Sequence, residues 1–464
     1  MKSQPIFDWQ STLIQTLCAG LLAILFLVGF QYMVSGEWIS STYFSSLTSD
    51  AMMQTVPIAQ LRNAPFESLY YLHIQPPLFD AIRAFIASFA DRNIVNEDML
   101  IRYVDVRLHQ ILIALFGILS ALIFCWVKLA TRSTIFAGIV TLGWVFYPTP
   151  IFLSTLLDGT LLSAVFITWM ILELWLIFRG YGHSGRLSVA VLLCCLTRSF
   201  FQWYFMPILL LSLFLLGMKL KKIVFVSLFL ALGFGSYVFK QYSVFGVTST
   251  STFSGQHMAG VLWIEEANPS GGLIWTGIET DSYREMINQR KAGLNKIYPR
   301  KAYSYSGGYN TKGQWQLNFI HSSIAKSQCA SSMQVCVSAL WKSFRQNWPE
   351  YWYVEGWGAS VVDNLPDWYK INYFRLSTRY LWFLGLATLL FLLLQSTRLK
   401  KKDQFYKCVG LILVPGFIFG ICIFGNRFDW YEGGRMKFFL EPVYFVFISS
   451  QIYLFFSRFW GRKE

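Results

Sequence analysis

This chain has two carboxylates and three basic residues that could take part in catalysis. Each lies near the boundary of an apolar stretch. Asp50 follows the first such stretch, and Asp158 lies between two later ones. The basic residues at corresponding boundaries are Arg198, Arg435 and Lys437. A carboxylate can accept a proton from an attacking hydroxyl, while guanidinium and ammonium groups can hold a phosphate and stabilise the charge that develops on it. Together these groups suit transfer from a phosphate carrier to a hydroxyl.

Three further residues belong to the same set of candidates. His73 and Gln75 occur in the run His-Ile-Gln-Pro-Pro, shortly after Asp50, and Arg107 precedes the second long apolar stretch. A histidine and an amide beside two fixed proline dihedrals could shape a binding site for a phosphate-linked substrate.

Each candidate also has a purely structural interpretation, which the sequence leaves open. Asp50 could cap a helix, and Asp158 could cap the span that follows it. Arg198 could reach lipid headgroups, and Arg107 could anchor the chain at the membrane interface. His73, next to two prolines, could stabilise a turn by hydrogen bonds.

The elements that must position these residues are membrane helices. The chain is 55% hydrophobic and 14% charged, whereas soluble domains carry roughly a quarter charged residues. We therefore predict an all-α polytopic membrane protein with about ten crossings, each of roughly 17–25 residues. Nine of them cover residues 12–34, 108–130, 134–156, 159–178, 200–217, 223–244, 379–397, 408–425 and 438–457, and a shorter stretch at 187–197 is the tenth.

The placement of charge supports this count. With both termini on the inside, most basic residues outside the large loops fall on inner segments, as the positive-inside rule predicts. These residues are Lys2, Lys128, Arg132, Arg179, Arg186, Lys219, Lys221, Lys222, Arg398, Lys400, Lys401, Lys402, Lys407, Arg458, Arg462 and Lys463. The net charge of +14 therefore requires no nucleic-acid partner, because such residues set orientation and meet anionic lipid.

Two outside regions interrupt the predicted spans. The first loop, 35–107, lies within an N-terminal membrane core of residues 1–244 and should contain juxtamembrane helices. One of these, Pro77–Phe89, is expected to lie along the interface. Residues 245–378 should form an external domain of mixed structure, and residues 379–464 the C-terminal membrane helices.

The cysteines predict a disulfide rather than a metal site. Cys329 and Cys336 are the two that fall in the large outside region, where an oxidising environment would join them. The remaining cysteines lie in or next to apolar stretches, where a thiol serves as a small apolar side chain. No set of Cys and His has the spacing of a metal site.

The pattern of motifs resembles the GT-C superfamily of membrane glycosyltransferases. The resemblance is to the branch that contains the protein O-mannosyltransferases and the lipid A aminoarabinose transferases. It rests on an acidic residue in the first loop and a following His-x-Gln-Pro-Pro-Leu segment. Four further elements occur in the family's order: Arg107-Leu-His-Gln, Leu157-Asp158-Gly159-Thr160, Leu196-Thr197-Arg198 and Gly434-Arg435-Met436-Lys437-Phe438-Phe439-Leu440-Glu441-Pro442. The chain departs from the family in its first loop, where two adjacent acids are usual and Asp50 is followed by Ala51.

This resemblance implies a fold and a reaction. The fold is a GT-C-type core, and the reaction moves one sugar from a polyprenyl-phosphate carrier to an acceptor hydroxyl, with inversion at the anomeric carbon. Asp50 would be the base or would orient the acceptor, and Asp158 would position the sugar or the partners of Asp50. Arg198 and Arg435, with Lys437, would hold the phosphate. The remaining donor-site residues would be His73, Gln75 and Arg107.

The expected partners are therefore a polyprenyl-phosphate-linked sugar, membrane lipid and a glycolipid, glycan or protein acceptor. No cofactor is predicted, and a divalent ion between Asp50 and the donor phosphate stays open. The expected location is a bacterial inner membrane, with the site on the periplasmic face. Two alternatives remain: an oligosaccharide ligase or polymerase that uses pyrophosphate-linked donors, and a lipid or solute transporter. Transporters usually show paired repeats and ionisable groups deep within their spans.

Overall fold

The computed structural model describes residues 9–35, 48–50, 55–91, 93–255, 281–294, 296–305, 307, 310–352, 402–424 and 436–460. Regular structure within these ranges is helical, and the β-type pairing there is one isolated bridge between Gly307 and Asn310. The predicted all-α class is therefore confirmed.

Five helices are long and apolar enough to cross a membrane. They are α1 (Trp9–Ser35), α5 (Glu97–Thr131), α8 (Thr160–Phe178), α11 (Leu220–Phe245) and α18 (Lys402–Phe424). Shorter apolar helices are α6 (Thr134–Val145), α9 (Ser184–Thr197) and α10 (Phe205–Leu215), and α20 (Glu441–Trp460) closes the described chain. These helices indicate a membrane protein. The count of about ten crossings stays a prediction, and the stretch 379–397 lies outside the described residues.

The stretch 134–156, predicted as one crossing, is divided. It contains α6 and then α7 (Pro148–Leu153), with Tyr147 between them in an extended conformation at φ −72° and ψ 129°. A proline disfavours helical dihedrals at the residue before it and lacks an N–H to continue the hydrogen-bond ladder. Pro148 follows Tyr147 directly, so no single helix covers this stretch.

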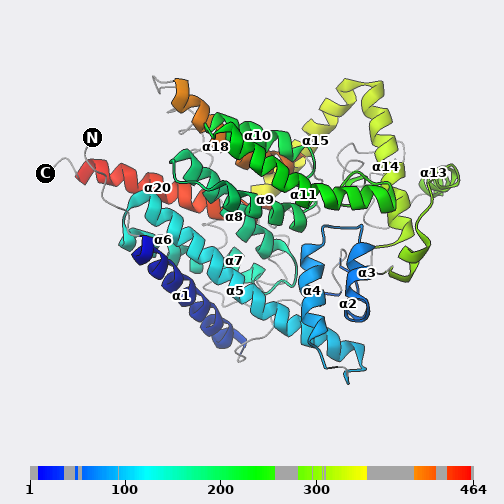
Figure 1. Cartoon of the computed structure of the whole chain (residues 1–464), viewed down its shortest axis with the longest axis horizontal. Coiled ribbons are helices and arrows are strands. Elements are labelled where there is room, and N and C mark those ends of the chain that lie inside the picture. Colours follow the sequence, from blue (N-terminus) through cyan, green and yellow to red (C-terminus); the bar gives the residue numbers. More distant parts are fainter. Residues whose placement is uncertain are drawn as a thin grey trace.

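Helix α5 lies at the centre of the packing. It contacts α1, α6, α8 and α20, and α1 runs beside it in Figure 1. The two helices approach closely at a pair of glycines, because a Cβ on Gly117 would lie 3.0 Å from the carbonyl oxygen of Gly20. Small residues permit such close crossings in membranes, where packing rather than water drives helix association.

The chain gathers its loop helices at one end of the molecule, which we call the loop end. It consists of α2 (Ile58–Asn63), α3 (Pro65–Tyr70), α4 (Leu78–Ser88), α13 (Asp281–Ala292), the 3₁₀ helix η1 (Arg300–Tyr305) and α14 (Lys312–Ser331). In Figure 1 these helices lie toward the right, whereas α1 begins and α20 ends on the left. The described part of 245–378 is helical, in contrast to the mixed structure that we predicted.

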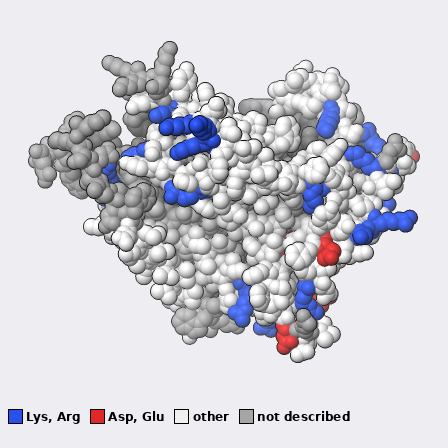
Figure 2. Space-filling view, in the orientation of Figure 1, with Lys and Arg blue, Asp and Glu red and all other residues white. Residues whose placement is uncertain are grey.

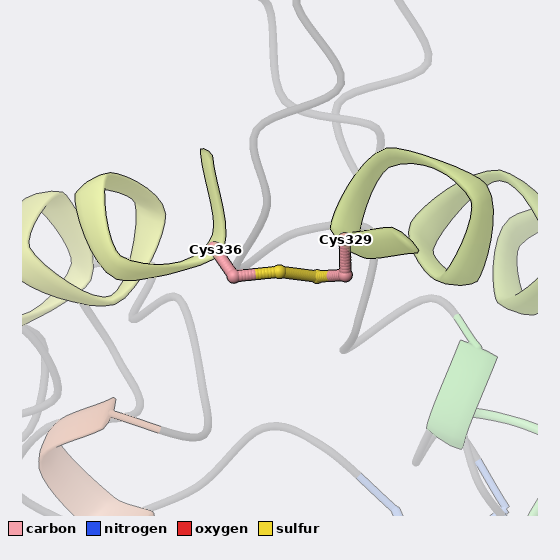
Figure 3. The surroundings of a disulfide bond; sticks show 2 residues. All are labelled: Cys329 and Cys336. Atoms are coloured by element: carbon pink, nitrogen blue, oxygen red, sulfur yellow. A yellow bond between two sulfur atoms is a disulfide. The ribbon is translucent and has the colours of Figure 1, made fainter. Parts of the chain in front are cut away.

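Cys329 and Cys336 form the disulfide that the sequence predicts. It joins the last turns of α14 to the first turns of α15 (Met333–Trp352), with the two Cα atoms 5.4 Å apart (Figure 3). Helix α15 then packs on α18, where the Asn347 amide donates to the Ile423 carbonyl at 2.8 Å. The disulfide therefore fixes the turn of a helical hairpin whose second arm reaches the membrane helices.

Helix α4 begins after Pro77, as predicted, and its two charged residues are buried. Its expected place along the membrane interface stays a prediction. Asp80 and Arg83 are both fully buried, while Phe85 and Phe89 are 65% and 66% exposed. The charges point inward because each has an oppositely charged partner there.

Candidate functional site

A buried ion cluster at the loop end contains the first-loop carboxylate. The guanidinium group of Arg83 lies between two acids: Nη2 donates to Asp50, and Nη1 lies 2.6 Å from Oδ1 of Asp80. Arg83 also donates to the Ser49 hydroxyl at 3.3 Å and to the Val56 carbonyl at 2.8 Å. A buried charge is tolerated when it is paired and hydrogen-bonded in this way. The cluster fixes the segment around Asp50 on α4.

The two acids differ in what they face. The side chain of Asp80 is fully buried, whereas that of Asp50 keeps 15% of its surface exposed. Both oxygens of Asp50 accept the N–H of Ile58, at 3.0 and 3.2 Å, so Asp50 also caps α2. Its Oδ1 binds Arg83 in addition, which leaves Oδ2 with fewer bonds. A fixed, partly exposed carboxylate oxygen can accept a proton from a hydroxyl.

A third carboxylate, Asp105 on α5, lies beside the cluster. It is 5% exposed, and both of its oxygens accept the N–H of Ser49 at 3.3 Å. Through this hydrogen bond, α5 is joined to Ser49, which directly precedes Asp50 in the chain. Three carboxylates share the neighbourhood of one guanidinium group, so this part of the loop end carries an excess of negative charge.

Burial raises the pKa of the Asp50 carboxyl above its ordinary value of 3.8, and the charge of Arg83 and the Ile58 N–H oppose that rise. Burial likewise raises the pKa of Asp80, against the charge of Arg83 and the hydrogen bond from Gln75. Within the described ranges, no group of three or more His, Cys, Asp and Glu is arranged to hold a metal ion.

The side chains of His73 and Gln75 have different hydrogen-bond partners. The His73 ring is fully buried, with Nδ1 3.0 Å from the Thr252 hydroxyl and Nε2 3.2 Å from the Tyr298 hydroxyl. Burial, with a smaller effect of the charge of Lys240, lowers the pKa of His73 to about 3. This is the hydrogen-bonding role that the sequence left open. Gln75 instead donates to Asp80 Oδ2 at 3.0 Å, and so joins the ion cluster.

Asp158 and Arg198 meet at the start of α8. Asp158 accepts the N–H of Thr160 at 2.7 Å and its hydroxyl at 2.6 Å, which is a local helix-capping arrangement. Arg198 Nη2 lies 2.7 Å from the same hydroxyl, and its Nε donates to the Ser163 hydroxyl at 3.0 Å. One threonine hydroxyl therefore bridges the predicted carboxylate and the predicted phosphate ligand.

The segment before α20 adds a second basic group. Lys437 is fully buried, with Nζ 3.3 Å from Oε1 of Glu441, and the Tyr147 hydroxyl donates to that oxygen at 3.0 Å. The Arg198 guanidinium carbon lies 4.9 Å from the centre of the Phe439 ring. Arg198 thus packs on the segment that carries Lys437. Arg435 lies outside the described residues.

Helix α4 brings the two clusters together. Phe79 packs on Gly159, where an added Cβ would lie 3.6 Å from the Phe79 ring, and the next residue, Asp80, binds Arg83. Helix α4 therefore contacts the Asp50 cluster through Asp80 and Arg83, and the start of α8 through Phe79. Arg107 is not part of this arrangement, because it is exposed on α5 and donates to Gln110 of the same helix at 3.1 Å.

Sequence reasoning missed several residues of this site, including Asp80, Arg83 and Asp105. Asp80 and Arg83 are three residues apart, which is the spacing of an ordinary surface ion pair on a helix. A sequence signal for their burial was available, because Asp80 and Arg83 share turns of α4 with Phe79 and Ala84. These four residues lie on the buried side of the helix. Asp105 lies just before the predicted second span, and the signal for it was an acid at the boundary of an apolar stretch, where ionisable groups are costly.

Comparisons of the chain with models of protein families, with curated proteins and with solved structures give no match.

Proposed function

We propose that this protein is a glycosyltransferase of the GT-C type, which moves one sugar from a polyprenyl-phosphate carrier to an acceptor hydroxyl. The observation that carries the proposal is that α4 contacts both an acid cluster and the helix start to which a basic group binds. Arg83 of α4 holds Asp50, a partly exposed carboxylate. Phe79 of α4 packs on Gly159, and Arg198, at the end of α9, binds the hydroxyl of the next residue, Thr160. A proton acceptor and a phosphate ligand are the two groups that the transfer requires.

The reaction assigns a role to each group. The acceptor oxygen attacks the anomeric carbon as the bond from that carbon to the phosphate oxygen breaks. The electron pair of the broken bond leaves with the phosphate, whose charge Arg198 stabilises. The acceptor proton passes to Oδ2 of Asp50, the oxygen with fewer bonds. Asp158 acts through the Thr160 hydroxyl and orients Arg198.

The location of these groups suits a lipid-linked donor. Arg198 ends α9, an apolar helix, and Lys437 precedes α20. An isoprenoid chain can lie between apolar helices while its phosphate meets basic groups at their ends. The proposed site is on the periplasmic face of a bacterial inner membrane, at the loop end.

The test is sugar transfer by the purified protein in detergent, offered a panel of polyprenyl-phosphate monosaccharides with membrane extract as the source of acceptor. Wild type should release polyprenyl phosphate. Asp50→Asn should lower the rate at least about 100-fold, the usual scale for loss of a general base. Asp91→Asn is the matched control, because Asp91 is an exposed acid of the same loop and should be neutral.

Three outcomes contradict the proposal. One is the absence of release from every monosaccharide donor by well-folded wild type. Another is full activity of Asp50→Asn. The third is release from pyrophosphate-linked oligosaccharides alone, which would identify a ligase or polymerase instead.

A further inference from the structure

The segment Arg290–Lys312 at the loop end has an unusual composition. It contains six Lys and Arg, four Tyr and no Asp or Glu. Figure 2 shows Lys and Arg gathered on the side of the molecule that carries α13, and a separate group at the upper left, near the start of α11. The second group lies where the positive-inside rule expects basic residues. The first lies at the opposite end, so that rule does not account for it.

Two lysines of this segment lie against aromatic rings, and one of them, Lys296, also donates to the Gly246 carbonyl at 3.2 Å. Lys296, Arg300, Lys301 and Lys312 are exposed, and none of them forms an ion pair with any residue that the structure describes. Lys296 Nζ lies 4.0 Å from the centre of the Phe319 ring, and Lys312 Nζ lies 5.8 Å from that of Tyr303. A cation over a ring keeps its charge available to an anion from solution.

Tyrosines form a row across the same surface. Tyr70 of α3 packs edge-on against Tyr71, with ring centres 5.1 Å apart, and Tyr71 stacks on Tyr305 of η1 at 5.2 Å. Tyr70 and Tyr303 are each 50% exposed. Rings of this kind present an apolar face and a polar edge at little conformational cost. The row also joins the first loop to the segment after α13.

A buried segment links the tyrosine row to the ion cluster of the proposed active site. Lys240, at the end of α11, lies 5.9 Å from the centre of the Tyr70 ring, and its Nζ donates to the Leu72 carbonyl at 2.9 Å. The chain then runs through His73 to Gln75, which donates to Asp80 in the ion cluster. A ligand on the tyrosine row would lie beside the segment that leads to Asp50.

We propose that the surface formed by Lys296, Lys301, Tyr303, Lys312 and Tyr70 binds an anionic glycan, which is the acceptor of the sugar transfer. This inference rests on the proposed function. Tyrosine faces stack on the C–H face of a sugar ring, and the lysines bind its carboxylate or phosphate groups. A membrane-binding surface would instead pair its cations with inserted apolar side chains. Here the exposed side chains that follow Lys301 are Tyr303 and Ser304, and among the described residues the one large apolar side chain exposed beside these lysines is Ile297, next to Lys296.

The test is direct binding by calorimetry to the full-length protein in detergent, with two tetrasaccharide probes. Tetragalacturonate is acidic, and maltotetraose is neutral. We expect tetragalacturonate to bind at least about tenfold more tightly than maltotetraose, with an affinity that falls as salt screens the charges. Dihexanoyl phosphatidylglycerol, below its micelle concentration, is the probe for a lipid headgroup.

Two variants examine the surface itself. Replacing Lys296, Lys301 and Lys312 together by Gln should weaken tetragalacturonate binding at least about tenfold, and Tyr303→Ala should weaken it about fivefold, within the range measured for stacking on an aromatic side chain. The matched control replaces Lys219, Lys221 and Lys222 by Gln. These residues are also exposed, and their loss changes the net charge equally at the other end of the molecule. The control should leave binding unchanged.

Equal affinity for the two tetrasaccharides would overturn the inference. So would equal loss in the control variant, or binding of the phosphatidylglycerol probe alone. Release of polyprenyl phosphate, measured on the same preparations, separates this inference from the proposed function. Donor cleavage without tetragalacturonate binding would leave the glycosyltransferase standing and remove the glycan surface. Tetragalacturonate binding without donor cleavage would support the glycan surface and contradict the glycosyltransferase activity.

Discussion

Arg83 is shared by two carboxylates that are buried to different degrees. Asp80 has no exposed surface and receives bonds from Arg83, Gln75 and the Val56 N–H. Asp50 keeps part of its surface and caps α2. A fully enclosed acid serves structure, whereas an acid at the edge of the same cluster can meet a substrate. The two residues should therefore differ in what their loss affects.

We expect Asp80→Asn to destabilise the protein by about 3–5 kcal/mol, because it leaves a buried guanidinium group without one of its two partners. Asp50→Asn should cost less than about 2 kcal/mol, since its site is partly exposed and Asn retains an acceptor oxygen. Thermal unfolding of both variants in detergent measures the difference. Equal destabilisation would mean that Asp50 is as structural as Asp80.

The raised pKa of Asp50 predicts the pH dependence of turnover. Asp50 must be ionised to accept a proton, so activity should fall with decreasing pH at a higher pH than an ordinary carboxylate with a pKa of 3.8 would allow. The charge of Glu97, an exposed residue, adds to this rise. Glu97→Gln should therefore move the acid limb of kcat/KM to lower pH by a few tenths of a unit, on the scale of a screened surface charge.

The control for this shift is Asp98→Asn, which removes the adjacent exposed acid. If the acid limb of kcat/KM shifts equally in both variants, or in neither, then the ionisation of Asp50 does not set that limb.

Sequence reasoning identified the residues at the boundaries of apolar stretches, but not the partners that orient them. Asp50, Asp158, Arg198 and Lys437 stood out because ionisable groups are costly near a membrane. Arg83 did not, since its burial depends on an acid more than thirty residues away in the chain. Local spacing cannot report a partner that only the folded chain brings near.

At the scale of elements, the first turn of α8 links a carboxylate to a basic group through one hydroxyl. Thr160 donates to Asp158 and accepts from Arg198. The sequence showed the Leu-Asp-Gly-Thr run at the start of a helix, and the structure adds the connection to the end of α9. The helices themselves could be predicted from apolar stretches. The break at Tyr147 was missed because hydropathy alone joins the stretch, although Pro148 and Pro150 were a signal for it in the sequence.

Thr160→Val tests this connection. Valine has a similar shape but no hydroxyl, so Arg198 would lose its hydrogen bond to Thr160 and Asp158 would lose one of its donors. We expect donor affinity to fall about tenfold, equivalent to about 1.4 kcal/mol, with a smaller effect on kcat. Titration with a non-transferable polyprenyl-phosphate analogue measures it.

Thr141→Val is the matched control, because that buried hydroxyl donates to the Ala137 carbonyl of its own helix at 2.8 Å. An equal loss of donor affinity in both variants would show that the effect of Thr160 is general destabilisation rather than orientation of Arg198.

At the scale of the whole molecule, three segments far apart in the sequence are joined at His73. Its ring contacts Thr252 and Tyr298, and its backbone N–H donates to the Asn310 side chain at 3.0 Å. The first loop and the region after α11 therefore form one packed unit at the loop end. The sequence placed both regions outside the membrane, but it gave no sign that a histidine would connect them, because their pairing is a property of the folded chain.

This connection predicts how stability depends on pH. In the unfolded chain His73 takes up a proton near pH 6.5, whereas in the folded protein its pKa is lowered to about 3, because burial disfavours the charged ring. The unfolded state thus binds more protons between these values. The contribution of His73 to stability is complete above pH 6.5 and is lost as the pH falls below it, by about 1.4 kcal/mol per pH unit. Between pH 6.5 and 5 the loss is about 2 kcal/mol.

The melting temperature should therefore fall as the pH decreases from 7.5 to 5, and His73→Asn should reduce that slope. The variant removes the ionisable ring but keeps polar atoms for Thr252 and Tyr298. The slope should not vanish, since burial also lowers the pKa of His321, to about 4, and acts in the same direction. An unchanged slope in His73→Asn would mean that the ring is accessible to protons in the folded protein. The first loop and the region after α11 would then not be closed over His73.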